Sequence, residues 1–389
     1  MSYKGLIGVD WEERVDFRRM REERLSKTKA SMEKNGIDAL LLFRWENLRY
    51  TTGQRYVAVP NSPFEHCASF TALKQNGEPI IFSMDIEDIK SRAPWISAEN
   101  LKPHHYVQTE SGAKALAGQL KALGFNRGKL GVDLWDPTCL EVLQRDLPGT
   151  KLVNGQKVMM DARMIKTWDE IECLKIAYAI GESALQAGLG ILGPGVRECE
   201  VQAAIWKRAL ELGAEWFQSP VIVTSKTTPY RRFTSDNIIL EGDSVIIDLG
   251  PVFNGYFSDF VRTWYCGKYK KPSQKAKDAF QKAYKVLQKV IESMKPGVKT
   301  GEVFASAGEF VLGRMLGHGV GLAGQEPPYI TEDEAGVSVQ IEPGMVFSVE
   351  PYVQIPGAET GFRLEEQVLI TKEGPKVYST FPHGPFSES

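Results

Sequence analysis

Two patterns of apolar residues alternate along the first part of the chain. Apolar positions at helical spacing predict helices over residues 15–35 and 113–123. Short continuous apolar runs predict buried strands, at residues 37–43, 79–82 and 129–133. Gly36 ends the first helix, and residues 47–53 are expected to form a loop. Strands that alternate with helices predict an α/β domain.

The pattern changes near residue 160. Thr167 and Glu170 form a capping box that opens a helix running to about residue 192. Further helices are predicted over 197–212 and 274–294, and strands over 219–224, 244–252, 256–265, 346–353 and 361–370. Because these strands come as hairpins, the second half is predicted to be an α+β domain. We therefore expect two domains, 1–160 and 161–389.

The segment 242–264 carries the most informative pattern. Two apolar runs flank Asn254-Gly255, a strong signal for a two-residue hairpin turn. This turn places Gly250 opposite Asp259 and makes Asp248 a diagonal neighbour of Asp259, at roughly 7 Å. Two like charges in an apolar sheet repel each other, and a cation between them would remove that cost; Gly250 is expected to leave room beside it. The alternative is that both aspartates lie in solvent at strand ends, paired with Arg262 or a lysine.

Three more residues favour the cation. Glu350 and Glu365 each lie in an apolar strand and can face each other if those strands pair. His318 lies in a glycine-rich turn, where backbones can approach closely. Four carboxylates and one imidazole suit a pair of Mn, Fe, Co or Zn ions.

Composition narrows the class of protein. The chain has 389 residues, 47 Lys+Arg and 49 Asp+Glu, so its net charge of −2 gives no field that would attract nucleic acid or a membrane surface. No apolar run approaches the ~18 residues of a membrane span, and the first residues lack the apolar core of a signal peptide. Five scattered Cys without a CxxC pair favour reduced thiols. We expect a cytoplasmic protein that binds neither nucleic acid nor membrane.

These residues resemble the pita-bread superfamily of methionine aminopeptidase, aminopeptidase P, prolidase and creatinase. The metal-dependent members have ligands in the order Asp, Asp, His, Glu, Glu, with ten residues between the two Asp, as between Asp248 and Asp259. The neighbouring sequence is similar too, in the strings 247–250, 258–263, 317–322, 342–346 and 363–365. The first half is similar to the creatinase/prolidase N-terminal domain, so the resemblance covers nearly the whole chain.

The resemblance implies a fold and a site. The fold is α+β, a pita-bread catalytic domain preceded by a creatinase-type α/β domain. Two divalent ions would be held by Asp248, Asp259, His318, Glu350 and Glu365. Asp259 and Glu365 would bridge them, and Glu350 would accept a proton in catalysis. Glu366 is expected to point to the opposite face of its strand. Members with this N-terminal domain form homodimers, which we expect here as well.

The sequence departs from the proline-specific peptidases at three positions. Where those enzymes place further histidines, this chain has Arg231, Arg314 and Gln325. Arginine is a permanent cation and glutamine cannot shuttle a proton, so we expect these residues, with Tyr352 and Arg363, to line an altered substrate pocket. The alternative is that both arginines form surface salt bridges and Gln325 is a loop residue.

We therefore expect a dinuclear metallohydrolase of the Xaa-Pro peptidase/creatinase type, acting on a dipeptide or small amide. A lyase is the second hypothesis, because the C-terminal strings are similar to the dimethylsulfoniopropionate lyase branch of the superfamily. That branch has an additional Asp where this chain has Gly250. A binding module without catalysis is the third; such members usually lose the metal ligands, and all five residues are present here.

Overall fold

The computed structural model describes residues 14–55, 69–134, 136–224, 233–267, 269–309, 311–332, 338–353 and 361–384. Its contacts divide the chain into two compact units, one of residues 16–163 and the other chiefly of the residues from 164 onward. The boundary expected at residue 160 falls inside a helix, α6 (Gly155–Met164). Among the helices described, none is long and apolar enough to cross a membrane.

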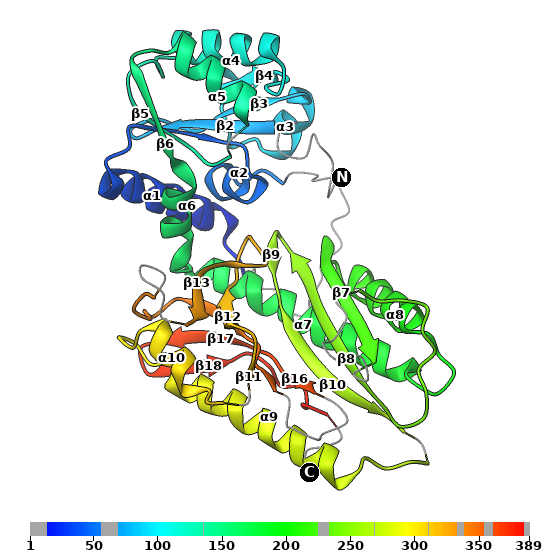
Figure 1. Ribbon diagram of the computed structural model, residues 1–389. Coiled ribbons are helices and arrows are strands. Elements are labelled where there is room, and N and C mark those ends of the chain that lie inside the picture. Colours follow the sequence, from blue (N-terminus) through cyan, green and yellow to red (C-terminus); the bar gives the residue numbers. More distant parts are fainter. Residues whose placement is uncertain are drawn as a thin grey trace. The chain divides into compact units, whose positions relative to one another are not determined.

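The first unit is a sheet of six strands in the order β4-β3-β2-β1-β5-β6 (Figure 1). Its strands are β1 (Ala39–Leu42), β2 (Ser69–Lys74), β3 (Ile80–Ser83), β4 (Leu101–Pro103), β5 (Gly128–Val132) and β6 (Thr150–Asn154). Its helices are α1 (Phe17–Asn35), α2 (Trp45–Thr52), α3 (Ile86–Arg92), α4 (Glu110–Ala122), α5 (Pro137–Asp146) and α6, with a 3₁₀ turn at Ala98–Asn100. The alternation of strands and helices predicted from the sequence is confirmed.

Residues 47–53 were expected to be a loop, but residues 47–52 belong to α2 and Gly53 is its C-cap. The side chain of Asp133, on the loop that follows β5, accepts hydrogen bonds from the backbone N–H groups of Phe43 (2.7 Å) and Arg44 (3.1 Å), just before the first turn of α2. Burial is the main reason that the pKa of Asp133 rises to about 6. A carboxylate about 90 positions away along the chain therefore supports the start of this helix. The residues next to α2 in the sequence give no sign of this contact.

The second unit pairs helices with antiparallel strands. Its helices are α7 (Trp168–Ile191), α8 (Glu198–Glu211), α9 (Gln274–Ser293) and α10 (Thr300–Ser306). One sheet runs β10-β8-β7, with β9 paired to β8; these strands are β7 (Trp216–Thr224), β8 (Asp243–Phe253), β9 (Tyr256–Phe257) and β10 (Phe260–Cys266). A five-stranded sheet contains β12 (Met315–Gly319), β13 (Glu326–Thr331), β14 (Val346–Val349), β17 (Glu366–Thr371) and β18 (Gly374–Val377), and a small sheet contains β11 (Val311–Leu312), β15 (Tyr352–Val353) and β16 (Phe362–Arg363).

In the second unit, helices bury one face of each of the two larger sheets, and the opposite face of the β7–β8–β10 sheet carries both polar residues and a small apolar cluster that includes Ile246 and Val261. On β8, Val245, Ile247 and Leu249 pack in one core cluster with α7 and α8. On β14, Phe347 and Val349 pack with α9 and α10. Since side chains alternate along a strand, Asp248 and Ser348 lie on the faces turned away from the helices.

Candidate metal centre

Asp248 and Asp259 come together through the β8–β9–β10 hairpin. Phe253 pairs with Tyr256, and Phe260 with Leu249, so the register predicted from Asn254-Gly255 is confirmed. Asp248 lies opposite Val261, which makes the two aspartates diagonal neighbours on one face. The structure gives a reason of its own for Gly250, because a Cβ there would lie 2.5 Å from the carbonyl oxygen of Ser258, and the room expected beside a cation stays a prediction. Gly250 permits close approach of its own hairpin partner.

Glu350 and Glu365 lie at directly opposite positions. Val349 pairs with Glu366 at the end of β14, and Tyr352 pairs with Arg363 at the start of β15. The two ladders share one register, and Glu350 and Glu365 are opposite positions between them, as predicted. The backbone N–H of Glu365 donates to the carbonyl of Val261 (3.2 Å), which joins this pair to the aspartate hairpin.

His318 completes the group from β12. Its Nδ1 lies 3.0 Å from the carbonyl oxygen of Gly319, so this nitrogen carries a proton and donates it. Nε2 lies 3.6 Å from Asp259 Oδ2 and 3.4 Å from Glu350 Oε1. The ring is thus held with Nε2 toward the carboxylates.

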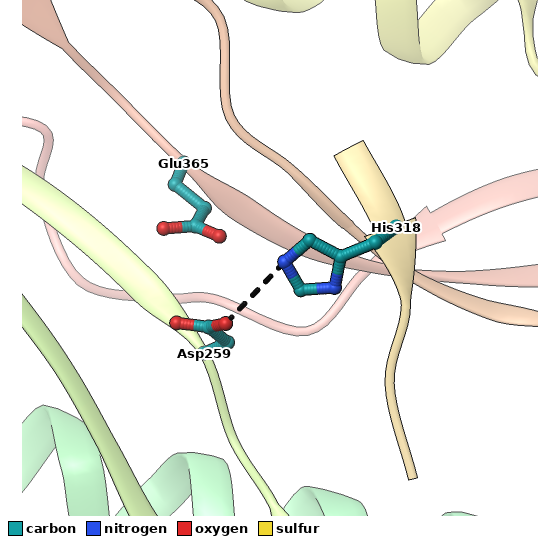
Figure 2. Close-up of side chains that lie close together, drawn as sticks. All are labelled: Asp259, His318 and Glu365. Atoms are coloured by element: carbon teal, nitrogen blue, oxygen red, sulfur yellow. Dashed lines mark ion pairs between the residues drawn. The ribbon is translucent and has the colours of Figure 1, made fainter. Parts of the chain in front are cut away.

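Asp259, His318 and Glu365 form the tightest part of the cluster. Each offers one ligand atom, and these atoms lie within 4.8 Å of one another. Figure 2 shows the two carboxylates and the imidazole converging on one another; His318 lies on β12, Asp259 just before β10 and Glu365 just before β17. All three side chains are buried.

The negative charges of the carboxylates in this group repel one another when no cation lies between them. Burial, followed by the charges of Glu365, Asp248 and Glu350, raises the pKa of Asp259 well above its usual value. Burial and the charge of Glu350 raise the pKa of Glu365 to about 7. Burial disfavours the charged form of His318, but its hydrogen bond with Glu350 and the charge of that group outweigh burial and raise its pKa. The site therefore favours bound protons or another source of positive charge.

A match to known families agrees with this geometry. A model of the metallopeptidase family M24 matches residues 172–372, which is more than half of the chain, and a model of the creatinase/prolidase N-terminal domain matches residues 24–165. The chain belongs to the metallopeptidase family M24. It is therefore a metallohydrolase with a pita-bread catalytic domain and a creatinase-type N-terminal domain, as predicted.

Individual relatives of this M24 protein match it over half to nearly all of its length. An Xaa-Pro dipeptidase of Pyrococcus horikoshii is 29% identical over 368 residues, which cover 91% of this chain and 96% of the relative. An Xaa-Pro dipeptidase of Pyrococcus furiosus is 34% identical over 229 residues, or 56% of this chain and 64% of the relative. The crystal structure of the prolidase from Pyrococcus horikoshii superimposes with a TM-score of 0.75 at 26% identity, covering 92% of this chain and 99% of that one.

The residues present fit the metal that family membership implies. Glu365 Oε2 is buried and has no hydrogen-bond partner among the described residues, although Glu365 Oε1 accepts from the hydroxyl of Ser348 at 2.7 Å. An oxygen of this kind is costly to bury unless a ligand outside the protein satisfies it. Carboxylates with one imidazole are also the donors that Mn, Fe, Co and Zn accept.

The sequence analysis did not predict that Ser348 and Arg363 lie beside the carboxylates of the cluster. Ser348 lies on β14 and is fully buried beside Glu365. Arg363, expected only as a substrate contact, pairs with Asp248 (3.1 Å) and contacts Glu350. Tyr352 lies opposite Arg363 and is buried. A guanidinium thus balances two of the four carboxylates, and the other two form the tight group with His318.

The structure shows no contact between the metal cluster and the other pocket candidates that it describes, Arg314 and Gln325. Arg231 falls outside the described residues. Arg314 is exposed and pairs with Glu332 (2.9 Å), which is the surface salt bridge weighed as its alternative. Gln325 is exposed just before β13. Their roles in substrate binding stay predictions.

Proposed function

We propose that this protein is a dinuclear metal-dependent dipeptidase that acts on Xaa-Pro dipeptides or similarly small amides. The names of two relatives support the substrate class, since both are Xaa-Pro dipeptidases. The convergence of Asp259, His318 and Glu365 within 4.8 Å carries the proposal, because these three residues could hold a metal ion, which a metallopeptidase uses for hydrolysis.

In this proposal five side chains hold two divalent ions: Asp248, Asp259, His318, Glu350 and Glu365. Asp259 and Glu365, the two carboxylates of the tight group with His318, would bridge the ions. Asp248 and Glu350 would exchange part of their contact with Arg363 for metal. The ions would polarise the amide carbonyl as Lewis acids and acidify a water molecule. Manganese, cobalt, iron and zinc all suit these donors.

The side chains around the ions have separate tasks. His318 presents Nε2 because Nδ1 donates to Gly319, which fixes the neutral tautomer that can act as a ligand. Glu350 is the proposed proton acceptor; it lies against His318 and Arg363, which orient its carboxylate. Ser348 orients Glu365 through a hydrogen bond to Oε1.

In this proposal the substrate pocket differs from that of the proline-specific relatives. Gln325 and two arginines, Arg231 and Arg314, occupy positions where proline-specific relatives are expected to have histidines. Permanent cations favour a substrate with a free carboxylate close to the scissile bond, as a dipeptide has. The homodimer and the cytoplasmic location expected from the sequence remain predictions.

The test is a substrate panel with controlled metal content. Metal-free protein is reconstituted with Mn²⁺ and offered Ala-Pro, Leu-Pro and, as a control, Ala-Ala. We expect cleavage of the Xaa-Pro dipeptides that disappears with chelator and in Asp259→Asn. Fully metallated protein that cleaves none of them would refute the dipeptidase. Release of an alkene from a sulfonium acid by that same protein would identify a lyase instead.

A further inference from the structure

Arg262 is a buried cation on β10 that contacts the main chain of a proposed metal ligand. Its side chain is 0% exposed. Nη1 donates to the carbonyl of Glu365 at 2.7 Å and to that of Val261 at 3.1 Å. Arg262 also lies three positions after Asp259 on the same segment. One guanidinium therefore joins the two chain segments that carry Asp259 and Glu365.

The other side of this guanidinium holds the C-terminal residues 378–383, which we call the tail segment. Nη2 donates to Ser379 Oγ (2.6 Å) and the carbonyl of Phe381 (3.3 Å), and Nε donates to the carbonyl of Pro382 (3.3 Å). The tail segment thus accepts three hydrogen bonds from a residue that also holds Glu365.

The tail segment also forms hydrogen bonds with the carboxylate of Glu182, which lies on α7. Its Oε1 accepts from the backbone N–H groups of Thr380 (2.8 Å) and Phe381 (2.9 Å) and from the hydroxyl of Ser379 (3.1 Å). Its Oε2 accepts from the hydroxyl of Thr380 (3.2 Å). Four donors converge on one carboxylate, so Glu182 is the main anchor of this segment.

Glu366 balances the charge of Arg262. Glu366 Oε1 lies 2.9 Å from Arg262 Nη2 and 2.8 Å from His383 Nε2, and Glu366 Oε2 accepts from the hydroxyl of Tyr178 at 3.0 Å. As expected, Glu366 points away from the metal cluster. A buried ion pair by itself adds little stability over apolar packing, whereas a fork of fixed donors specifies geometry.

We infer that Arg262 is a positioning residue of the metal centre, through which the anchored tail segment sets the place of Glu365. The inference rests on the proposed metal site. When the tail segment detaches, Nε and Nη2 of a fully buried guanidinium lose three hydrogen-bond acceptors. The guanidinium then shifts toward water, and its 2.7 Å bond to the Glu365 carbonyl weakens. Metal affinity falls although no ligand has changed.

The experiment measures Mn²⁺ affinity of full-length, metal-free protein by calorimetry, well below the unfolding temperature of every variant. Glu182→Ala removes the anchor of the tail segment. Arg262→Lys keeps the charge opposite Glu366 but cannot reach Glu365 and the tail segment together. Gln186→Ala is the matched control, an exposed residue one turn further along α7. Hydrogen exchange of Thr380 and Phe381 amides reports whether the tail segment has detached.

We expect Mn²⁺ affinity to fall about 10-fold in Glu182→Ala and between about 10- and 100-fold in Arg262→Lys, which is the usual range for groups that hold metal ligands. Gln186→Ala should bind as the wild type does, and Glu182→Asp should recover part of the loss. Unchanged affinity in Arg262→Lys, or in Glu182→Ala with fast-exchanging tail amides, would overturn the inference. Wild-type protein that binds no Mn²⁺ would instead refute the proposed metal site.

Discussion

The raised pKa of Glu365 predicts that metal-free protein loses stability as the pH rises. The unfolded carboxyl titrates near 4.5 and the folded one near 7, so between these values the folded state binds more protons. The free energy of unfolding therefore decreases as the pH rises between these two values. The stabilising contribution of Glu365 is fully present below about pH 4.5 and is lost above about pH 7. Asp259 and His318, whose pKa values are also raised, act in the same direction.

The size of the effect follows from the two pKa values. At about 1.4 kcal/mol per pH unit, Glu365 alone lowers the free energy of unfolding by about 3 kcal/mol at high pH, of which about 2 kcal/mol is lost between pH 5.5 and 8. Glu365→Gln keeps the shape and cannot ionise. The pH dependence of the variant should therefore be smaller than that of the wild type by about 2 kcal/mol over this range.

Urea unfolding of metal-free protein in chelator, at pH 5.5 and pH 8, measures this difference. The relevant transition is the one that moves when Mn²⁺ is added, because it belongs to the unit that holds the cluster. Mn²⁺ should stabilise the wild type more at pH 8 than at pH 5.5, since it replaces the protons. Wild type and Glu365→Gln with the same pH dependence would refute the electrostatic reasoning.

Three further substitutions test parts of the site. Ser348→Ala removes a hydrogen bond to a charged group, worth about 1.5–3 kcal/mol, and should weaken Mn²⁺ binding about 10-fold or more by calorimetry; equal affinity would mean that Ser348 does not orient Glu365. Gly250→Ala forces a Cβ to 2.5 Å from the Ser258 carbonyl oxygen and should lower the free energy of unfolding in urea by about 1–3 kcal/mol. The control is Gly190→Ala, on α7 with open space around it, which should raise that free energy by up to about 1 kcal/mol. An unchanged stability in Gly250→Ala would contradict the close approach. Arg363→Met leaves Asp248 and Glu350 without their shared cation, so thermal unfolding of metal-free protein at pH 8 should come at lower temperature, with a smaller difference once Mn²⁺ is bound; an unchanged midpoint without metal would argue against that role.

The aspartate pair was predictable because a short-range signal sets its register. Asn254-Gly255 fixes a two-residue turn, and from it the diagonal placement of Asp248 and Asp259 follows by counting. For Glu350 and Glu365 the sequence indicated only that they can face each other if their apolar strands pair, and the register came from the structure. Helices α7 and α9 follow in the same way from caps and apolar spacing.

Features that depend on contacts distant in sequence could not be predicted. Asp133 supports the start of α2 from another part of the first unit, so residues 47–53 resembled a loop. Arg363 lies two positions before a proposed ligand, but its contacts with Asp248 and Glu350 arise only when two sheets meet. Ser348 could have been suspected from its place two positions before Glu350, a polar residue in an apolar strand. The link between Arg262 and the tail segment has no local signature at all.

The measurement that tests the account most directly is a titration of metal-free protein with Mn²⁺ while hydrolysis of an Xaa-Pro dipeptide is recorded. The account predicts no hydrolysis without metal and a rate that rises until about two ions are bound per chain, the number a two-metal hydrolase needs. Asp259→Asn should bind less Mn²⁺ and remain inactive. Hydrolysis that persists in metal-free protein, or its absence when the cluster is fully loaded, would contradict the account.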